Sequence, residues 1–380
     1  MLWVDKYRPK TLKHTSYHPQ ISSRLQALSS SSANNAMPHL LFYGPSGSGK
    51  KTRISCLLKS IYGPGADRLR LDKRTFTTPT KRTVEINMIS SNYHIEMSPG
   101  DAGLNDRYVV QEVIKEMAQN KSLNSAGTME FASNPLAMKK SDVKSSKKAE
   151  FKVVLLVDVD RLSRQAQAAL RRTMEKYAST CRLILCCQNP SKVIEPVRSR
   201  CLGIRVPAPS HDDIISVLQS IATKEKLTLP PKLALTIAQE SSRNVRRAVL
   251  MLEAYHVQHR DVFAMKASSN LPPIQKTDWE VYITQLANDI TKEQSPQRLM
   301  AAREKLYELL INCIPAQVII KTLAVELCKN LDDELKHEVI EWAAFYEHRI
   351  AMGSKDIFHL EAFIAKYMAM YKRYLNALFA

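Results

Sequence analysis

A short glycine-rich segment limits the fold of this chain more than any other feature does. The chain has 380 residues and only ten glycines, yet Gly44, Gly47 and Gly49 fall within six positions. The residues before them, HLLFY at 39–43, are typical of a buried strand, and those after them, 50–62, repeat apolar residues at helical spacing. The order strand, glycine loop, helix predicts a phosphate-binding turn, because amides in such a loop and at the helix N-terminus can cradle phosphate groups.

Apolar strand runs alternate with amphipathic helices over roughly the first 208 residues. Helices are expected at 106–118 and 163–178, and further strands at 68–76, 82–89, 93–97, 153–157, 183–187 and 202–206. This alternation favours an α/β fold with a mainly parallel sheet that helices cover on both faces. The stretch 119–150 is rich in Ser, Asn and Lys and lacks periodicity, so we expect a surface insertion there.

Beyond residue 208 the apolar periodicity is helical to the end of the chain. We therefore expect three domains: an α/β domain over 1–208 that carries the insertion 119–150, a small helical domain over 209–268, and an all-helical domain over 277–380. The stretch 266–276, with two adjacent prolines, is the expected linker.

The charge and the cysteine content indicate which kinds of partner and which cysteine chemistry to expect. Lys and Arg total 55 against 37 Asp and Glu, and ten basic residues against two acidic ones fall between Arg161 and Arg205. Positive charge concentrated in one segment favours a polyanionic partner. No apolar run reaches the ~20 residues that span a bilayer, so we expect a soluble protein without a membrane partner. The seven cysteines lack metal-ligand spacing and are interpreted as reduced thiols.

The loop GPSGSGKK fits the phosphate-binding pattern GxxxxGK up to its last place. That place normally holds a Ser or Thr whose hydroxyl ligates Mg²⁺, whereas here it is Lys51. We expect ATP or ADP to bind along the loop, with Mg²⁺ as a cofactor whose usual ligand is replaced. The expected nucleotide-binding residues are Gly44, Pro45, Ser46, Gly47, Ser48, Gly49, Lys50, Lys51 and Thr52.

A second motif, VVLLVDVD at 153–160, has the acidic strand end of a Walker B segment. Asp158 is the residue expected to hold Mg²⁺. In many ATPases the next residue is a glutamate that polarises the attacking water. Here it is Val159, whose side chain can accept no proton. If strand alternation continues through Asp160, its side chain is expected to face away from the side on which Val159 lies. Nucleotide binding without hydrolysis is the first interpretation, and an active ATPase that uses Asp160 and Thr52 instead is the alternative.

Three further polar residues are of interest, and two of them, Gln188 and Arg246, each allow two interpretations. Gln188 follows the strand 183–187 and either orients water near a γ-phosphate or only ends the strand. Arg200, in SRC at 199–201, would usually be a surface charge. Arg246, in RNVRRAVLML, either reaches a phosphate or belongs to the basic face of an amphipathic helix.

Several motifs, in the same order, resemble those of replication factor C, the eukaryotic AAA+ complex that loads a ring-shaped sliding clamp onto primed DNA. They are WVDKYRPKTL at 3–12, GPSGSGKKT at 44–52, LVDVD at 156–160, QAALRRTMEKY at 167–177, SKVIEPVRSRC at 191–201 and RNVRRAVLMLE at 243–253. The resemblance implies an AAA+ P-loop domain, a helical lid and a collar. It also implies a nuclear protein with four other replication factor C subunits, the clamp proliferating cell nuclear antigen, and primer-template DNA as partners.

The altered loop and the missing glutamate resemble the small subunit that closes one end of the five-subunit arc. The resemblance implies that Arg200 is an arginine finger in a neighbour's ATP site. It further implies that Arg246 is the second-sensor arginine and that Gln188 stands where an asparagine first sensor is usual. By the same resemblance, the nucleotide base is lined by Val4, Arg8 and Ser16.

The helix 163–178 is the favoured DNA contact, since basic side chains that track a phosphate backbone bind without reading sequence. At about 100° per residue Arg164 and Arg171 share a face, and we expect DNA at these two and at Lys176. Arg172 is turned aside, where a salt bridge is at least as good an explanation. We also expect DNA at a hairpin tip formed by Lys81 and Arg82. A stand-alone nucleic-acid-binding protein is the third alternative.

Overall fold

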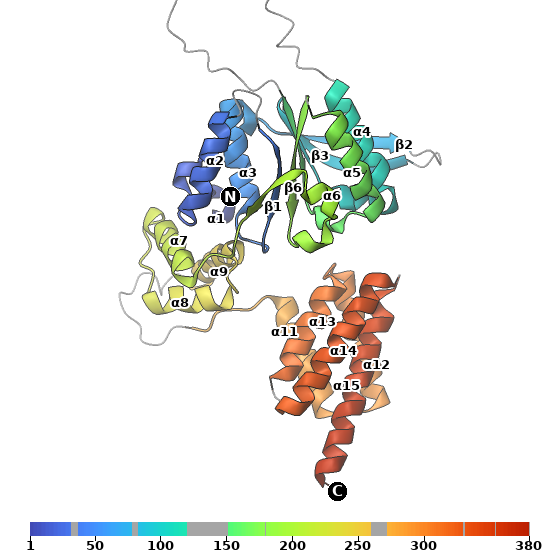
Figure 1. Cartoon of the computed structure of the whole chain (residues 1–380). Coiled ribbons are helices and arrows are strands. Elements are labelled where there is room, and N and C mark those ends of the chain that lie inside the picture. The colour runs from blue at the N-terminus through green and yellow to red at the C-terminus, as the bar shows by residue number, and fades with distance from the viewer. Residues whose placement is uncertain are drawn as a thin grey trace, which may run out of the picture. The chain divides into compact units, whose positions relative to one another are not determined.

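The computed structural model describes the chain except for residues 32–36, 78–82, 120–150, 179, 260–271, 330, 354 and 380. The chain divides into two compact units, Met1–Pro273 and Ile274–Ala380 (Figure 1). Nearly all of the expected insertion, and both Lys81 and Arg82, lie outside the described residues.

A seven-stranded sheet in the order β2-β3-β4-β5-β6-β1-β7 forms the centre of the first unit. The strands from β4 to β7 in this order run parallel, whereas β2 and β3 pair antiparallel and β3 runs antiparallel to β4. The predicted mainly parallel sheet is thus confirmed. The strands are β1 (His39–Tyr43), β2 (Arg70–Thr77), β3 (Thr83–Ser90), β4 (His94–Met97), β5 (Lys152–Leu156), β6 (Cys181–Cys187) and β7 (Cys201–Arg205).

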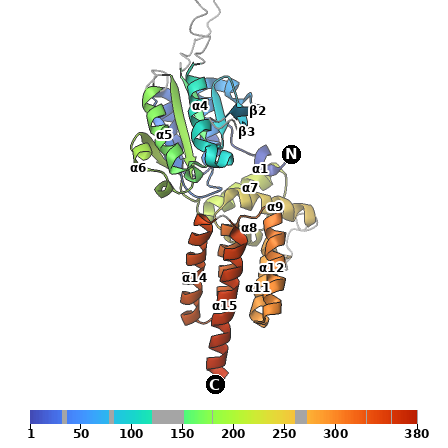
Figure 2. The same ribbon diagram turned by 90° about the vertical axis from the view of Figure 1, so that its right-hand side faces the viewer.

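Helices cover both faces of this sheet (Figures 1 and 2). On one face α2 (Pro19–Ser31) and α3 (Lys50–Tyr62) bury leucines and isoleucines against the side chains of Leu40 and Phe42. On the other, α4 (Asp106–Gln119) and α5 (Arg164–Lys176) form a separate apolar cluster. Shorter helices connect these elements: α1 (Trp3–Lys6), η1 (Leu12–His14), η3 (Gly63–Asp67), η4 (Pro99–Asn105), η6 (Val159–Arg161), η7 (Pro190–Lys192) and α6 (Glu195–Arg198).

Three helices after the sheet form a small group within the first unit: α7 (His211–Lys224), α8 (Pro231–Glu240) and α9 (Val245–Gln258). Two of them begin at side chains that satisfy free backbone N–H groups. Ser210 accepts a hydrogen bond from Asp213 N, whose carboxylate accepts one from Ser210 N, and Asn244 accepts one from Arg247 N. The last cap fixes where α9 starts, immediately beside Arg246.

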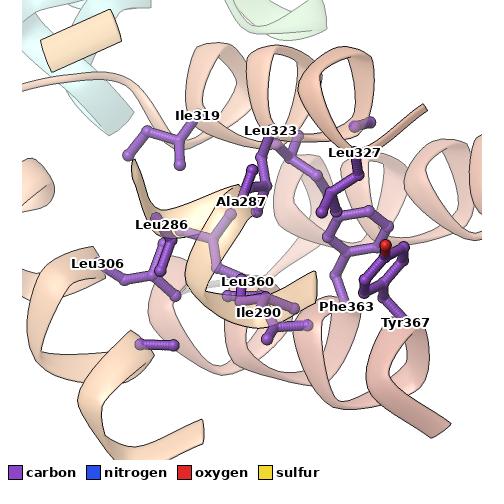
Figure 3. Packing of buried hydrophobic residues seen from close by; sticks show 14 of the residues in the cluster. Leu286, Ala287, Ile290, Leu306, Ile319, Leu323, Leu327, Leu360, Phe363 and Tyr367 are labelled. Carbon is purple, nitrogen blue, oxygen red and sulfur yellow. The ribbon is translucent and has the colours of Figure 1, made fainter. Parts of the chain in front are cut away.

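The second unit contains α11 (Asp278–Lys292), α12 (Pro296–Ile311), α13 (Ala316–Cys328), α14 (Asp333–Met352) and α15 (Asp356–Phe379). Figure 3 shows Leu286 and Ile290 of α11 directed into a core that Leu323 of α13 and Phe363 of α15 share. A membrane-crossing helix would need a length and apolarity that none of the helices in the described part of the chain reaches.

Candidate nucleotide-binding site

The glycine loop between β1 and α3 packs tightly against its neighbours. All three of its glycines have positive φ: 147° at Gly44, 73° at Gly47 and 86° at Gly49. A Cβ atom at Gly44 would lie 2.0 Å from the backbone oxygen of Val206, and one at Gly47 would lie 1.8 Å from Oδ1 of Asn244. Both the backbone conformation and the lack of space therefore require glycine.

The ammonium of Lys50 is held inside the curve of this loop. Its Nζ donates hydrogen bonds to the carbonyls of Gly44 (2.6 Å) and Pro45 (2.9 Å), and the side chain is largely buried. Ser48 Oγ also donates to Pro45 O, at 2.9 Å. The loop thus presents a positive charge at the N-terminus of α3, which is the arrangement that binds phosphate.

Arg53, which was not among the residues expected to bind nucleotide, stabilises the loop through hydrogen bonds. Its guanidinium is fully buried and donates to Ser48 O (3.1 Å) and Tyr17 O (2.8 Å), with the Tyr17 ring 4.6 Å away. The sequence does indicate that Arg53 is buried, because helical spacing puts it on the same face of α3 as the core residue Leu57. A buried arginine beside the loop adds positive charge that no acidic side chain in the described residues neutralises.

A cavity of about 590 Å³ opens beside the loop. Its walls come from the N-terminal segment, from the start of α3, and from α7 and α9, with apolar side chains such as Val217 and Ile221. This volume lies in the range of small-molecule sites. Of the residues expected to bind nucleotide, the cavity brings together Val4, Arg8, Ser16, Gly47, Gly49, Thr52 and Arg246.

Hydrogen bonds and ion pairs tie the N-terminal segment to both walls of the cavity. Arg8 Nε donates to Thr52 Oγ1 on α3 at 3.3 Å. Toward the helices after the sheet, Trp3 N donates to Glu253 Oε2 at 3.0 Å, and Lys6 pairs with Glu225 at 2.6 Å. The hydrogen bond from Lys6, together with one from Tyr7, lowers the pKa of the Glu225 carboxyl, so this contact stays charged at neutral pH.

The remaining expected nucleotide residues do not line the cavity. Gly44, Pro45, Ser46, Ser48, Lys50 and Lys51 belong to the loop itself or to the first turn of α3, and Asp158 and Gln188 follow the strands β5 and β6. The side chain of Gln188 is exposed, and its backbone N–H donates to Asp160 Oδ2 at 3.2 Å. Asn189 N donates to the same oxygen at 3.3 Å.

The strand alternation on which the expected orientation of Asp160 depends does not extend to this residue. β5 ends at Leu156, Asp158 adopts a left-handed conformation with φ 52°, and a short 3-10 helix follows. As a result Val159 is fully buried in the core beneath α5, whereas Asp160 turns toward the end of β6. The carboxylate of Asp160 therefore has a structural role at the end of β6.

Four charged side chains act on the Cys186 thiol at the end of β6. Burial raises the pKa of Cys186 to about 11; Lys50 and Lys51 act to lower it, and Asp158 and Asp160 act to raise it.

Lys51 also forms an ion pair with Glu96 of β4. Within the described residues no group of three or more His, Cys, Asp or Glu side chains is arranged to hold a metal ion. With an ammonium where a hydroxyl ligand is usual, these residues do not fit the expected Mg²⁺ site at Asp158.

Arg200 lies between α6 and β7, and it does not line the cavity of its own chain. All three nitrogens of its guanidinium have partners. Nε donates to Glu175 Oε1 at 2.8 Å, a second nitrogen lies 2.6 Å from the same oxygen, and the third donates to Pro196 O at 2.8 Å. The arginine is thus held by α5 of its own chain.

The helix α5 buries Ala166, Leu170 and Met174 and exposes its basic side chains. Arg164, Arg171, Arg172 and Lys176 are all exposed. The salt bridge considered for Arg172 is instead made by Arg171, whose Nε lies 3.7 Å from Glu175 Oε1. A shallow groove of about 370 Å³ beside α5 is lined by both arginines, Glu175 and Pro196.

Comparisons with known proteins cover the whole chain. Family models match at residues 20–210 (DNA polymerase III, delta subunit), 216–257 (RCF1/5-like, AAA+ ATPase lid domain) and 279–375 (Replication factor C subunit 3, C-terminal domain). The chain is similar to replication factor C subunit 5 of Oryza sativa subsp. japonica, with 51% identity over 100% of both chains. It is similarly related to replication factor C subunit 3 of Homo sapiens, with 50% identity over 99% of this chain and 97% of the human one.

Proposed function

Because the chain belongs to the replication factor C family and is a small subunit of this AAA+ clamp loader, we propose that it binds ATP or ADP without hydrolysing it. We propose in addition that it supplies Arg200 to the site of a neighbouring subunit. The observation that carries the proposal is that Lys51 stands at the sequence position of the hydroxyl residue that ligates Mg²⁺, and that its ammonium is paired with Glu96.

The cavity and the loop supply the groups that a nucleotide needs. The apolar wall at Val4 suits a base, with Arg8 and Ser16 beside it, and the amides of the loop together with Lys50 suit the phosphates. Arg246 lines the cavity from the first turn of α9 and is exposed. It can therefore contact the phosphates in the same pocket.

Hydrolysis lacks a group to activate water. Val159 is buried in the core and has no proton-accepting atom. Asp160, the base in the alternative proposal, already accepts two backbone hydrogen bonds at the end of β6. Both observations favour a pocket that binds nucleotide without hydrolysing it.

Single-turnover measurements with the purified full chain test this proposal. The wild-type chain is expected to bind radiolabelled ATP and to leave it intact, because Lys51 replaces the usual hydroxyl ligand of Mg²⁺ and Val159 replaces the usual base. Asp160→Asn is the comparison. If the wild-type chain hydrolyses ATP and Asp160→Asn abolishes this, the chain is an active ATPase and the proposal is wrong.

The proposed partners are the four other replication factor C subunits, the sliding clamp proliferating cell nuclear antigen and primer-template DNA in the nucleus. For DNA, the exposed basic side chains of α5 support the proposal, since they follow one another along one helix and two of them, Arg171 and Arg172, line a groove. Such contacts are with the phosphate backbone and depend strongly on salt concentration.

Replacing Arg164, Arg171 and Lys176 together with alanine should reduce the salt dependence of DNA binding by the assembled complex. Each lost phosphate contact lowers the slope of log affinity against log salt by about one, so we expect a fall of about three. Arg24→Ala on α2, on the opposite face of the sheet, is the control and should leave the slope unchanged. An unaltered slope in the triple variant would show that α5 does not contact DNA phosphates.

A further inference from the structure

The ion pair of Lys51 and Glu96 joins the phosphate-binding loop to the middle of the sheet. Lys51 is the second residue of α3, and Glu96 is the third residue of β4. Glu96 stands in register with Leu155 of β5, the strand that leads to Asp158. The pair therefore connects the first turn of α3, which follows the phosphate-binding loop, to the strand beside β5.

The local charges resemble those of a metal site in which the metal is replaced. Lys50 and Lys51 are two fixed cations near the end of β6, and Asp158 and Asp160 lie close enough to act on the same cysteine thiol. Glu96 is mostly buried and its carboxylate is already paired. The Lys51 ammonium, which is paired with Glu96, adds positive charge to this group of side chains and so opposes the binding of a divalent cation there.

We propose that the Lys51 ammonium, oriented by Glu96, takes the place of the metal ion, so that this pocket binds ADP or ATP without Mg²⁺. The proposal rests on the proposed function, because it concerns the same nucleotide pocket. Unlike a metal ion, the lysine is always present, and nucleotide occupancy would not follow the Mg²⁺ concentration. Glu96 acts as a positioning residue that holds the ammonium at the loop.

The experiment measures ADP binding to the purified full chain by calorimetry, once in excess Mg²⁺ and once in excess EDTA. The wild-type dissociation constants are expected to agree within about twofold. Lys51→Thr removes the ammonium, restores the hydroxyl and frees Glu96. In EDTA it should bind ADP about tenfold more weakly than wild type or worse, since a charge-assisted contact is lost, and Mg²⁺ should restore part of the affinity.

Two variants separate this effect from damage to the fold. Lys59→Thr removes a lysine from the same helix that is ion-paired to Asp67, away from the loop, and should behave as wild type. Lys51→Arg keeps the positive charge and should keep binding independent of Mg²⁺.

The outcomes distinguish the two levels of the proposal. ADP binding by the wild type that disappears in EDTA would overturn the metal-free pocket while upholding nucleotide binding, and so would undiminished binding by Lys51→Thr in EDTA. No ADP binding by the wild type in either condition would overturn the proposed function itself.

Discussion

Replacing Arg200 with alanine is expected to lower ATP turnover at a neighbouring subunit's site in the assembled complex by about 10³-fold. The reason is that an arginine finger neutralises charge that develops on the transferred phosphoryl group. Nucleotide binding by this chain should not change, because Arg200 lies outside its own cavity. Single-turnover hydrolysis by the reconstituted complex and ADP binding by the chain alone measure the two effects.

Arg200 has partners within its own chain that it must release before it can act on a neighbouring subunit. Its guanidinium is bound to Glu175 and to Pro196 O, so it must leave Glu175 before it can reach a phosphate on another subunit. Glu175 also lies near Arg171 on the DNA-facing side proposed for α5. Because the ion pair is half-exposed, its rupture costs little, about 1 kcal/mol or less.

Arg198→Ala is the matched control for Arg200→Ala. Arg198 is an exposed arginine two residues away, at the last position of α6, and its loss should leave turnover within about twofold of wild type because surface charges away from the reacting atoms contribute little. Unchanged turnover in Arg200→Ala, with normal assembly, would remove Arg200 from the catalytic proposal.

Replacing Gly44 with alanine should destabilise the Met1–Pro273 unit by about 3 kcal/mol or more and abolish nucleotide binding. The added Cβ would lie 2.0 Å from Val206 O, and Gly44 has φ 147°. Val206 cannot move aside easily, since its N–H donates to Tyr43 O at 2.8 Å beside the β1–β7 ladder. Denaturant unfolding and ADP binding measure the loss.

Gly63→Ala separates steric conflict from backbone strain. Gly63 also has positive φ, 76°, but an added Cβ would meet no atom within 4 Å. Only the conformational cost remains, about 1 to 3 kcal/mol, because Gly63 has ψ −163° and this region of φ and ψ is adopted almost only by glycine, and nucleotide binding should survive. If Gly44→Ala were no more destabilising than Gly63→Ala, the contact with Val206 would not constrain the loop.

Local pattern was sufficient for most of the architecture. Strand and helix periodicities are set by neighbouring residues, so β1, α3, β5 and β6 could be predicted within a few positions, and the helical character of the chain after residue 208 could be predicted as well. The same holds for the glycine loop, whose spacing and flanking elements identify it without knowledge of the tertiary structure. The family resemblance rested on these contiguous motifs, and the comparisons confirm it.

The details at strand ends were less predictable. The side-chain direction of Asp160 depended on where β5 ends, and the left-handed conformation of Asp158 shows that strand alternation does not reach Asp160. The role of Arg53 depended on Tyr17, which is distant in sequence and comes close only when the N-terminal segment folds over α3. Element boundaries and long-range contacts of this kind are not encoded in a short window of residues.

The sequence by itself determined the class of fold, the phosphate-binding loop and the two substitutions, Lys51 and Val159, that argue against hydrolysis. Only the tertiary structure decided what these residues contact. It inserted β1 between β6 and β7, two strands that come much later in the chain, and thereby placed Lys51 within reach of Glu96. Residue types are local properties, whereas contacts between distant residues follow from the strand order that the packed core selects.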